Sequence, residues 1–111
     1  MSEDKLQAIC YQWFHNSYPD LRGLLWAVPN GGSRNVVEAM KLKATGVVAG
    51  VHDLHFLYNG QLTTLELKVN NNPMSSKQKN WANTIEHHGA NWHLVTTFIQ
   101  FKEILQNIII V

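Results

Sequence analysis

Hydrophobic and polar residues recur along this chain with two periods, which predict four helices and four strands. Apolar side chains three or four positions apart predict a helix over residues 3–15, with one stripe formed by Leu6, Ile9, Cys10, Trp13 and Phe14. Three further helices are expected because a side chain that caps a helix precedes Glu or Gln by three positions. They run from Asn35 to about Ala44, from Ser75 to about His87 or His88, and from Thr97 to the C-terminus.

Short apolar or alternating runs predict strands over residues 24–28, 53–58, 61–69 and 92–95. Asn59-Gly60 separates the second and third runs, and Asn-Gly is typical of a two-residue hairpin turn. The hairpin gives one antiparallel pair, whereas every other pairing crosses over a helix. The predicted order is α-β-α-β-β-α-β-α, an α/β fold with a mixed central sheet flanked by helices.

Composition limits the class of protein. The 111 residues are 45% hydrophobic and 15% charged, which favours one globular domain over residues 1–111. No apolar run approaches the ~18 residues of a membrane span, and the acidic start at Glu3 and Asp4 is unlike a signal peptide. Cys10 is the only cysteine, which excludes an intrachain disulfide and favours a reducing, intracellular setting. We therefore expect a cytoplasmic protein without a membrane partner.

The net charge of +1 hides an uneven distribution. Residues 31–80 carry six Lys or Arg against three Asp or Glu, a net +3, whereas each flanking segment has a net −1. A basic middle favours an anionic partner such as a phosphate backbone.

The hairpin fixes which side chains face one another. If Asn59-Gly60 is a two-residue turn, paired residue numbers sum to 119, so Asp53 lies opposite Glu66 and Lys68 shares their face. The two Cβ atoms would be ~4.5–5.5 Å apart. Opposed carboxylates are neutralised either by a shared proton or by a cation, and Mg²⁺ prefers such ligands. The alternative is a surface salt-bridge cluster.

These residues belong to a wider pattern. The sequence resembles the virus-type replication-repair nuclease (VRR-NUC) branch of the PD-(D/E)XK superfamily, from about Glu3 to Ile104. The residues that carry the resemblance are Val28–Gly32, Ala39–Lys43, Gly46–Val51, Asp53, Glu66–Lys68, Ser76–Gln78 and Trp81. The resemblance implies a restriction-endonuclease-like fold and hydrolysis of DNA phosphodiester bonds.

The resemblance also implies individual roles. Asp53 and Glu66 would bind Mg²⁺ or Mn²⁺ by their side chains, with the main-chain carbonyl of Leu67 as a further ligand. Lys68 would contact the scissile phosphate or help to activate water, and Gln78 would support the site.

Glu3 and His52 are two further positions to compare with the family pattern. Glu3 matches the acidic residue of the family's first helix, although Asp4 is adjacent. His52 stands where the family pattern usually has Pro, a residue that shapes the backbone and performs no chemistry. On an extended strand His52 would point away from Asp53 and His55 would share its face, so we expect no joint zinc site and a structural His52.

DNA contacts are expected from a loop and from three lysines. Exposed main-chain amides and an arginine suit phosphate binding, and the resemblance favours DNA contact for Asn30, Gly31, Gly32, Ser33 and Arg34. The loop lacks the Gly-Lys-Ser/Thr ending of a P-loop, so no nucleotide cofactor is expected. Lys41, Lys43 and Lys77 are either solvated helix charges or further backbone contacts. The four tryptophans are expected in the core.

The C-terminal helix is apolar around most of its circumference and needs cover from the core or from a partner subunit. Stand-alone relatives are implied to be homodimers, and a twofold pair of sites suits cleavage of branched DNA such as a four-way (Holliday) junction. The sequence therefore predicts a Mg²⁺- or Mn²⁺-dependent endonuclease of a bacterial cell or a phage-infected host. The alternative is a non-catalytic module of the same fold that binds DNA or protein.

Overall fold

The structure is a computed structural model that describes residues 1–29 and 35–110. Its elements follow the predicted order, with one short 3₁₀ turn (η1) added after the first helix. They are α1 (Glu3–Ser17), η1 (Pro19–Leu21), β1 (Leu25–Ala27), α2 (Val36–Ala44), β2 (Leu54–Tyr58), β3 (Gln61–Leu67), α3 (Ser76–His87), β4 (Asn91–Val95) and α4 (Phe98–Ile108). None of the helices in these two ranges combines the length and apolarity that a bilayer crossing requires.

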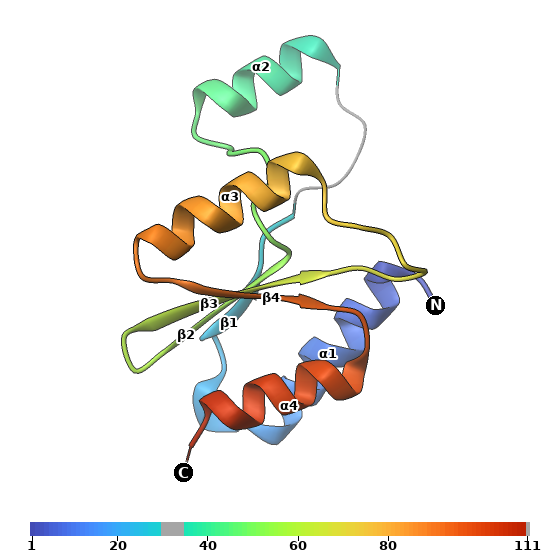
Figure 1. Cartoon of the computed structure of the whole chain (residues 1–111), viewed down its shortest axis with the longest axis vertical. Coiled ribbons are helices and arrows are strands. Elements are labelled where there is room, and N and C mark those ends of the chain that lie inside the picture. Colours follow the sequence, from blue (N-terminus) through green and yellow to red (C-terminus); the bar gives the residue numbers. More distant parts are fainter. Residues whose placement is uncertain (30–34, 111) are drawn as a thin grey trace.

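One four-stranded sheet organises the fold, in the order β1-β2-β3-β4. The pairs β1–β2 and β2–β3 are antiparallel, and β4 runs parallel to β3 because α3 carries the chain back between them. The predicted mixed sheet is confirmed. In Figure 1 helices α1 and α4 lie side by side on one face of the sheet, α3 covers the other, and α2 lies beyond α3.

The hairpin has the predicted register. Tyr58 pairs with Gln61 and Leu54 pairs with Leu65, so every pair sums to 119. Asn59 and Gly60 have φ values of +50° and +78°, the left-handed conformations that a two-residue turn of this kind requires. Strand β3 ends at Leu67, two residues earlier than predicted. The chain turns there because Asn70 and Asn71 both have positive φ.

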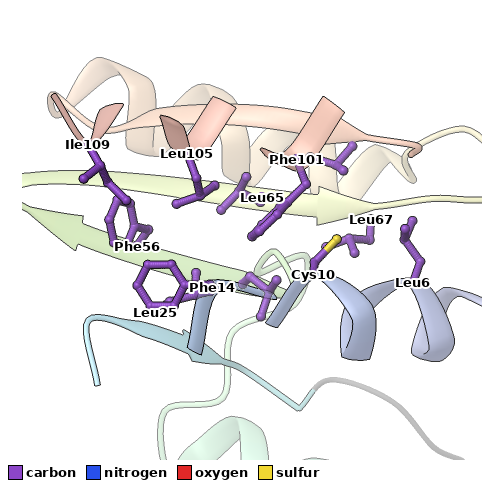
Figure 2. Close-up of a cluster of buried hydrophobic side chains, with 12 residues drawn as sticks. Leu6, Cys10, Phe14, Leu25, Phe56, Leu65, Leu67, Phe101, Leu105 and Ile109 are labelled. Atoms are coloured by element: carbon purple, nitrogen blue, oxygen red, sulfur yellow. The ribbon is translucent and has the colours of Figure 1, made fainter. Parts of the chain in front are cut away.

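The hydrophobic core lies between the sheet and the helices α1 and α4 (Figure 2). It contains Leu6, Cys10 and Phe14 of α1, Leu25, Phe56, Leu65 and Leu67 of the sheet, and Phe101, Leu105 and Ile109 at the C-terminal end. The monomer therefore covers the apolar face of α4. The predicted extension of this helix to the C-terminus is wrong, since α4 ends at Ile108.

The prediction that all four tryptophans lie in the core is wrong. Trp13 is half-buried and packs against the core, Trp81 and Trp92 are half-buried beside His52, and Trp26 is 38% exposed. Trp26 lies on the edge strand β1, where its ring packs on His55 of β2 at a centroid distance of 5.8 Å. An edge position leaves the other side of the ring open to solvent.

Gly50 marks a close approach between the chain before β2 and the first turn of α3. Its φ is +88°, and a Cβ at this position would overlap the main-chain carbonyl of Lys77. Gly46 also has a left-handed φ, +107°, but within the described residues no atom lies within 4 Å of an added Cβ.

We expect Gly50→Ala to lower the free energy of unfolding by more than Gly46→Ala. The left-handed conformation alone costs about 1 kcal/mol in both variants. Overlap with α3 should add on the order of 2 kcal/mol at Gly50. Urea denaturation of both variants beside the wild type measures the difference, and equal losses would contradict the tight contact with α3.

Candidate active site at Asp53, Glu66 and Lys68

The register of β2 and β3 brings two carboxylates together. The strand pairing ends at Leu54 with Leu65, and the next residues on the two segments are Asp53 and Glu66. Asp53 lies just before β2, where its Oδ2 accepts a hydrogen bond of 2.9 Å from the main-chain N–H of Leu67. Its main-chain carbonyl accepts another, of 2.9 Å, from Val28. The first bond holds Asp53 against the end of β3, and the second holds it against the end of β1.

Lys68 lies beside the carboxylate pair. Its Nζ is 3.5 Å from Oε2 of Glu66. The main-chain N–H of Lys68 donates to Val95, so the residue is still anchored to β4 although β3 has ended. The structure thus brings together Asp53, Glu66 and Lys68, three of the residues singled out in the sequence.

Gln78 reaches Glu66 from the first turn of α3. Its Nε2 donates to Glu66 Oε2 at 2.9 Å. The same amide takes part in a capping box, because Oε1 accepts from the main-chain N–H of Ser75 at 2.8 Å while Ser75 Oγ accepts from the N–H of Gln78. Since the cap occupies the amide oxygen, the amide nitrogen must face the carboxylate.

A pocket of about 520 Å³ opens over these groups. Its walls come from the start of α1, from the segment after β1 and from the hairpin. They are formed by Glu3, Asp4, Gln7, Ala27, Val28, Pro29, Asp53, Glu66, Lys68 and Gln78. Glu3 is half-buried and its negative charge raises the pKa of Asp53, whereas Asp4 is exposed. This difference favours Glu3 as the acidic residue of the first helix.

The two carboxylates are in an unfavourable electrostatic environment. Glu66 is only 1% exposed. Burial, and then the negative charge of Asp53, raise the pKa of Glu66 to about 7, while Lys68 acts in the opposite direction. Burial also raises the pKa of Asp53, against the hydrogen bond from Leu67, which lowers it. Near neutral pH the pair is therefore stabilised by a proton or a cation.

The donor set fits a hard divalent cation. Glu66 Oε1 is buried and has no hydrogen-bond partner among the described residues, so it has a lone pair to offer to a metal. Residues 1–29 and 35–110 contain no cluster of three or more His, Cys, Asp or Glu side chains suited to a metal. Two carboxylates and a main-chain carbonyl are oxygen ligands that suit Mg²⁺ or Mn²⁺, which keep several waters.

The histidines near the site have structural contacts. His55 lies on the face of Glu66, as predicted, and its Nε2 donates to the main-chain carbonyl of His52 at 3.2 Å. The prediction that His52 points away from this face is wrong, because His52 contacts Thr64, which shares the face of Glu66. The reason is that β2 begins only at Leu54, so strand alternation does not extend back to His52.

The lysines predicted to contact DNA belong to helices α2 and α3. Lys41, Lys43 and Lys77 are all exposed. Lys43 and Lys77 line a second pocket, of about 570 Å³, together with the segment Gly46–Ala49. Asn30, Gly31, Gly32, Ser33 and Arg34 lie outside the described residues.

Sequence reasoning did not identify Thr64. This residue is buried, lies on the face of Glu66 two positions earlier in β3, and contacts His52. The alternation of side chains along β3 could have identified it, because Thr64, Glu66 and Lys68 are two positions apart and therefore point to the same face.

Comparison with known proteins supports the fold through a solved structure. No family model matches the sequence, and no curated protein matches it. The solved structure of a VRR_NUC domain protein superimposes with a TM-score of 0.80. The match covers 98% of this chain and 88% of that one. This chain has the VRR_NUC fold.

The fold expected from the sequence resemblance is thereby confirmed. The two chains are 21% identical, so the likeness is one of fold. The roles of individual side chains in this VRR_NUC fold rest on the geometry given above.

The raised pKa of Glu66 predicts an unusual pH dependence of stability. Because the folded state binds this proton more tightly than the unfolded state, stability falls as pH rises from the ordinary value of 4.5 through about 7. Glu66→Gln removes the buried charge. The variant should therefore exceed the wild type by on the order of 2–3 kcal/mol at about pH 8, without metal, and match it near pH 4.

Urea denaturation across this pH range, with chelator present, measures the effect. Glu103→Gln, at an exposed position of α4, is the matched control and should follow the wild type. A wild-type stability that stays level from pH 4.5 to about 7 would contradict the raised pKa of Glu66.

Proposed function

We propose that this protein is a metal-dependent DNA endonuclease that hydrolyses phosphodiester bonds. The observation that carries the proposal is the half-buried Asp53 next to the buried Glu66, one oxygen of which has no hydrogen-bond partner among the described residues, with Lys68 beside it. The VRR_NUC fold supports the same conclusion, because the pair lies in a nuclease-family fold.

Each side chain has a role that follows from its surroundings. Asp53, Glu66 and the carbonyl of Leu67 would hold Mg²⁺ or Mn²⁺. Such a cation, when bound, supplies Lewis-acid polarisation of the phosphate and lowers the pKa of a water ligand. Lys68 offers a positive charge to the scissile phosphate and to the negative charge that develops on it.

The remaining residues of the pocket support this centre. Gln78 fixes one oxygen of Glu66 and leaves the other for the cation. Glu3 adds negative charge at the mouth of the pocket, which strengthens attraction for a divalent cation. These contacts support catalytic roles for Gln78 and Glu3 through the metal ligands.

The DNA substrate is supported by the basic middle of the chain. Lys41, Lys43 and Lys77 are exposed on α2 and α3, where a phosphate backbone would find positive charge. The proposed contacts at Asn30–Arg34 lie at the start of this segment of sequence. Branched DNA, in particular a four-way junction, is the proposed substrate, in a bacterial cell or phage-infected host.

A homodimer is part of the proposal, and α2 offers a surface for it. Val36, Val37 and Met40 are 74%, 77% and 67% exposed, an unusual density of bare apolar side chains on one helix. Glu38 lies near the start of α2 and Lys43 near its end. Two copies of α2 packed antiparallel about a twofold axis would therefore bring each Glu38 toward the partner's lysines.

The cleavage prediction compares Asp53→Asn and Lys68→Ala with the wild type on a labelled four-way junction and on linear duplex. Both variants should lose about 100-fold or more in rate with Mg²⁺ or Mn²⁺, since each removes charge stabilisation at the reacting phosphate. Lys102→Ala, on α4 and away from the pocket, is the control and should cut normally.

Junction cutting that survives Asp53→Asn would contradict the proposed active site. Equal cutting of junction and linear duplex would keep the chemistry and remove the proposed preference for branched DNA. If the folded wild type binds DNA but does not cut, the chain is a binding module.

Met40→Glu should convert the proposed dimer into a monomer, because it would bury a charge in the apolar contact. Sedimentation velocity measures the change. Ile99→Glu is the matched control, because Ile99 is equally exposed, at 67%, but lies on α4. A wild type that is monomeric at high concentration, or a dimer that Met40→Glu leaves intact, would contradict this interface.

A further inference from the structure

His52 is fully buried next to the candidate metal ligand Asp53. Its Nδ1 lies 2.9 Å from Thr64 Oγ1 of β3, and its Nε2 lies 3.2 Å from the main-chain carbonyl of Gln78 in α3. The imidazole ring therefore bridges the strand that carries Glu66 and the helix that carries Gln78. Trp81 of α3 packs against the same ring at a centroid distance of 4.8 Å.

The contacts determine the tautomer. The Gln78 carbonyl can only accept, so Nε2 of His52 must carry the proton. In the neutral ring Nδ1 then accepts from the Thr64 hydroxyl. Both ring nitrogens are thus used, and the orientation of the ring is fixed at two ends.

Gln78, whose main-chain carbonyl contacts His52, is also the residue that orients Glu66. Gln78 donates its amide nitrogen to Glu66 Oε2, while the capping box with Ser75 occupies its amide oxygen. A shift of the Gln78 main chain would move this amide relative to Glu66. The carbonyl that His52 holds belongs to the same residue, so the hydrogen bond sets the distance between the first turn of α3 and β3.

We infer that His52 is a positioning residue for the active site: its Nε2–H fixes Gln78, which in turn holds Glu66 with Oε1 free for the metal. This inference rests on the proposed function for its catalytic consequence. His52 touches neither the metal ligands' free oxygens nor the substrate, and it acts through Gln78. The contact with Thr64 holds the ring in place, and the N–H directed toward α3 acts on the site through Gln78.

Two substitutions separate the donor toward α3 from the contact with Thr64. Gln at residue 52 has a terminal amide nitrogen at about the reach of Nε2, so His52→Gln keeps the bond to Gln78. Asn reaches only as far as Nδ1, so His52→Asn keeps the contact with Thr64 and loses the bond to Gln78. Both variants remove the ring and its packing on Trp81, which makes them a matched pair for stability.

The first readout is the Gln78 side-chain amide in NMR spectra of the metal-free protein. The wild type and His52→Gln should show this amide shifted and protected by its bond to Glu66, whereas His52→Asn should show a freely exchanging amide. This readout requires no metal and no cleavage.

The second readout is junction cleavage. His52→Asn should lower kcat by about 10- to 100-fold with little change in KM for DNA, because misplacement at the metal affects the chemical step. The Mn²⁺ concentration for half-maximal activity should rise by about 10-fold or more, as expected when a group that orients a ligand is lost. His52→Gln should stay within about threefold of the wild type.

A protected Gln78 amide and undiminished kcat in His52→Asn would overturn the inference, and so would equal losses in the two variants. If neither variant folds, Thr64→Val removes the other anchor of the ring and should weaken the same two signals. Should the wild type neither bind Mn²⁺ nor cut, the proposed function fails, and the amide readout still decides whether His52 positions Gln78.

Discussion

The constraint on which the rest of this structure depends is the burial of Glu66 directly beside Asp53. Two neighbouring carboxylates repel one another, and removal from water raises the free-energy cost of keeping both ionised. Lys68 contributes only a 3.5 Å contact to one oxygen, and the other oxygen has no partner among the described residues. A protein retains such a pair where something else supplies the positive charge, and oxygen ligands of this kind suit a hard divalent cation.

Much of the surrounding fold can be understood as holding this pair in place. The Asn59-Gly60 turn sets the register, and the register determines which residues oppose one another. The missing side chain at Gly50 lets the first turn of α3 approach the segment before β2. That approach brings Gln78 to Glu66, and the capping box at Ser75 decides which end of the amide faces the carboxylate. Helices α1 and α4 build the core on the opposite face of the sheet, and only the start of α1 reaches the pocket.

Local sequence rules predicted the structure correctly wherever a single rule determines it. The hairpin register followed from a two-residue turn and a period of two, and the start of α3 followed from a Ser and a Gln three positions apart. The rules failed where tertiary packing decided. His52 precedes the strand, so its direction depended on the path of the chain rather than on alternation. Trp26 is exposed because β1 is an edge strand, which no local pattern reveals.

The same distinction applies to the terminal helix and to α2. An apolar α4 needed cover, and only the packing of Phe101, Leu105 and Ile109 under α1 and the sheet assigns that cover to the monomer. Helix α2, by contrast, has an ordinary N-cap at Asn35, yet its large apolar side chains near the N-terminal end remain exposed to solvent.

Calorimetry of Mn²⁺ binding tests most directly the proposal that Asp53 and Glu66 bind a divalent cation. Because the pKa of Glu66 is raised to about 7, Mn²⁺ must displace a proton from the pair below that pH. Titrations at about pH 6, in buffers with different heats of ionisation, should show close to one proton released per site, and far less near pH 8. Binding without proton release at both pH values, or no binding at all, would contradict the account.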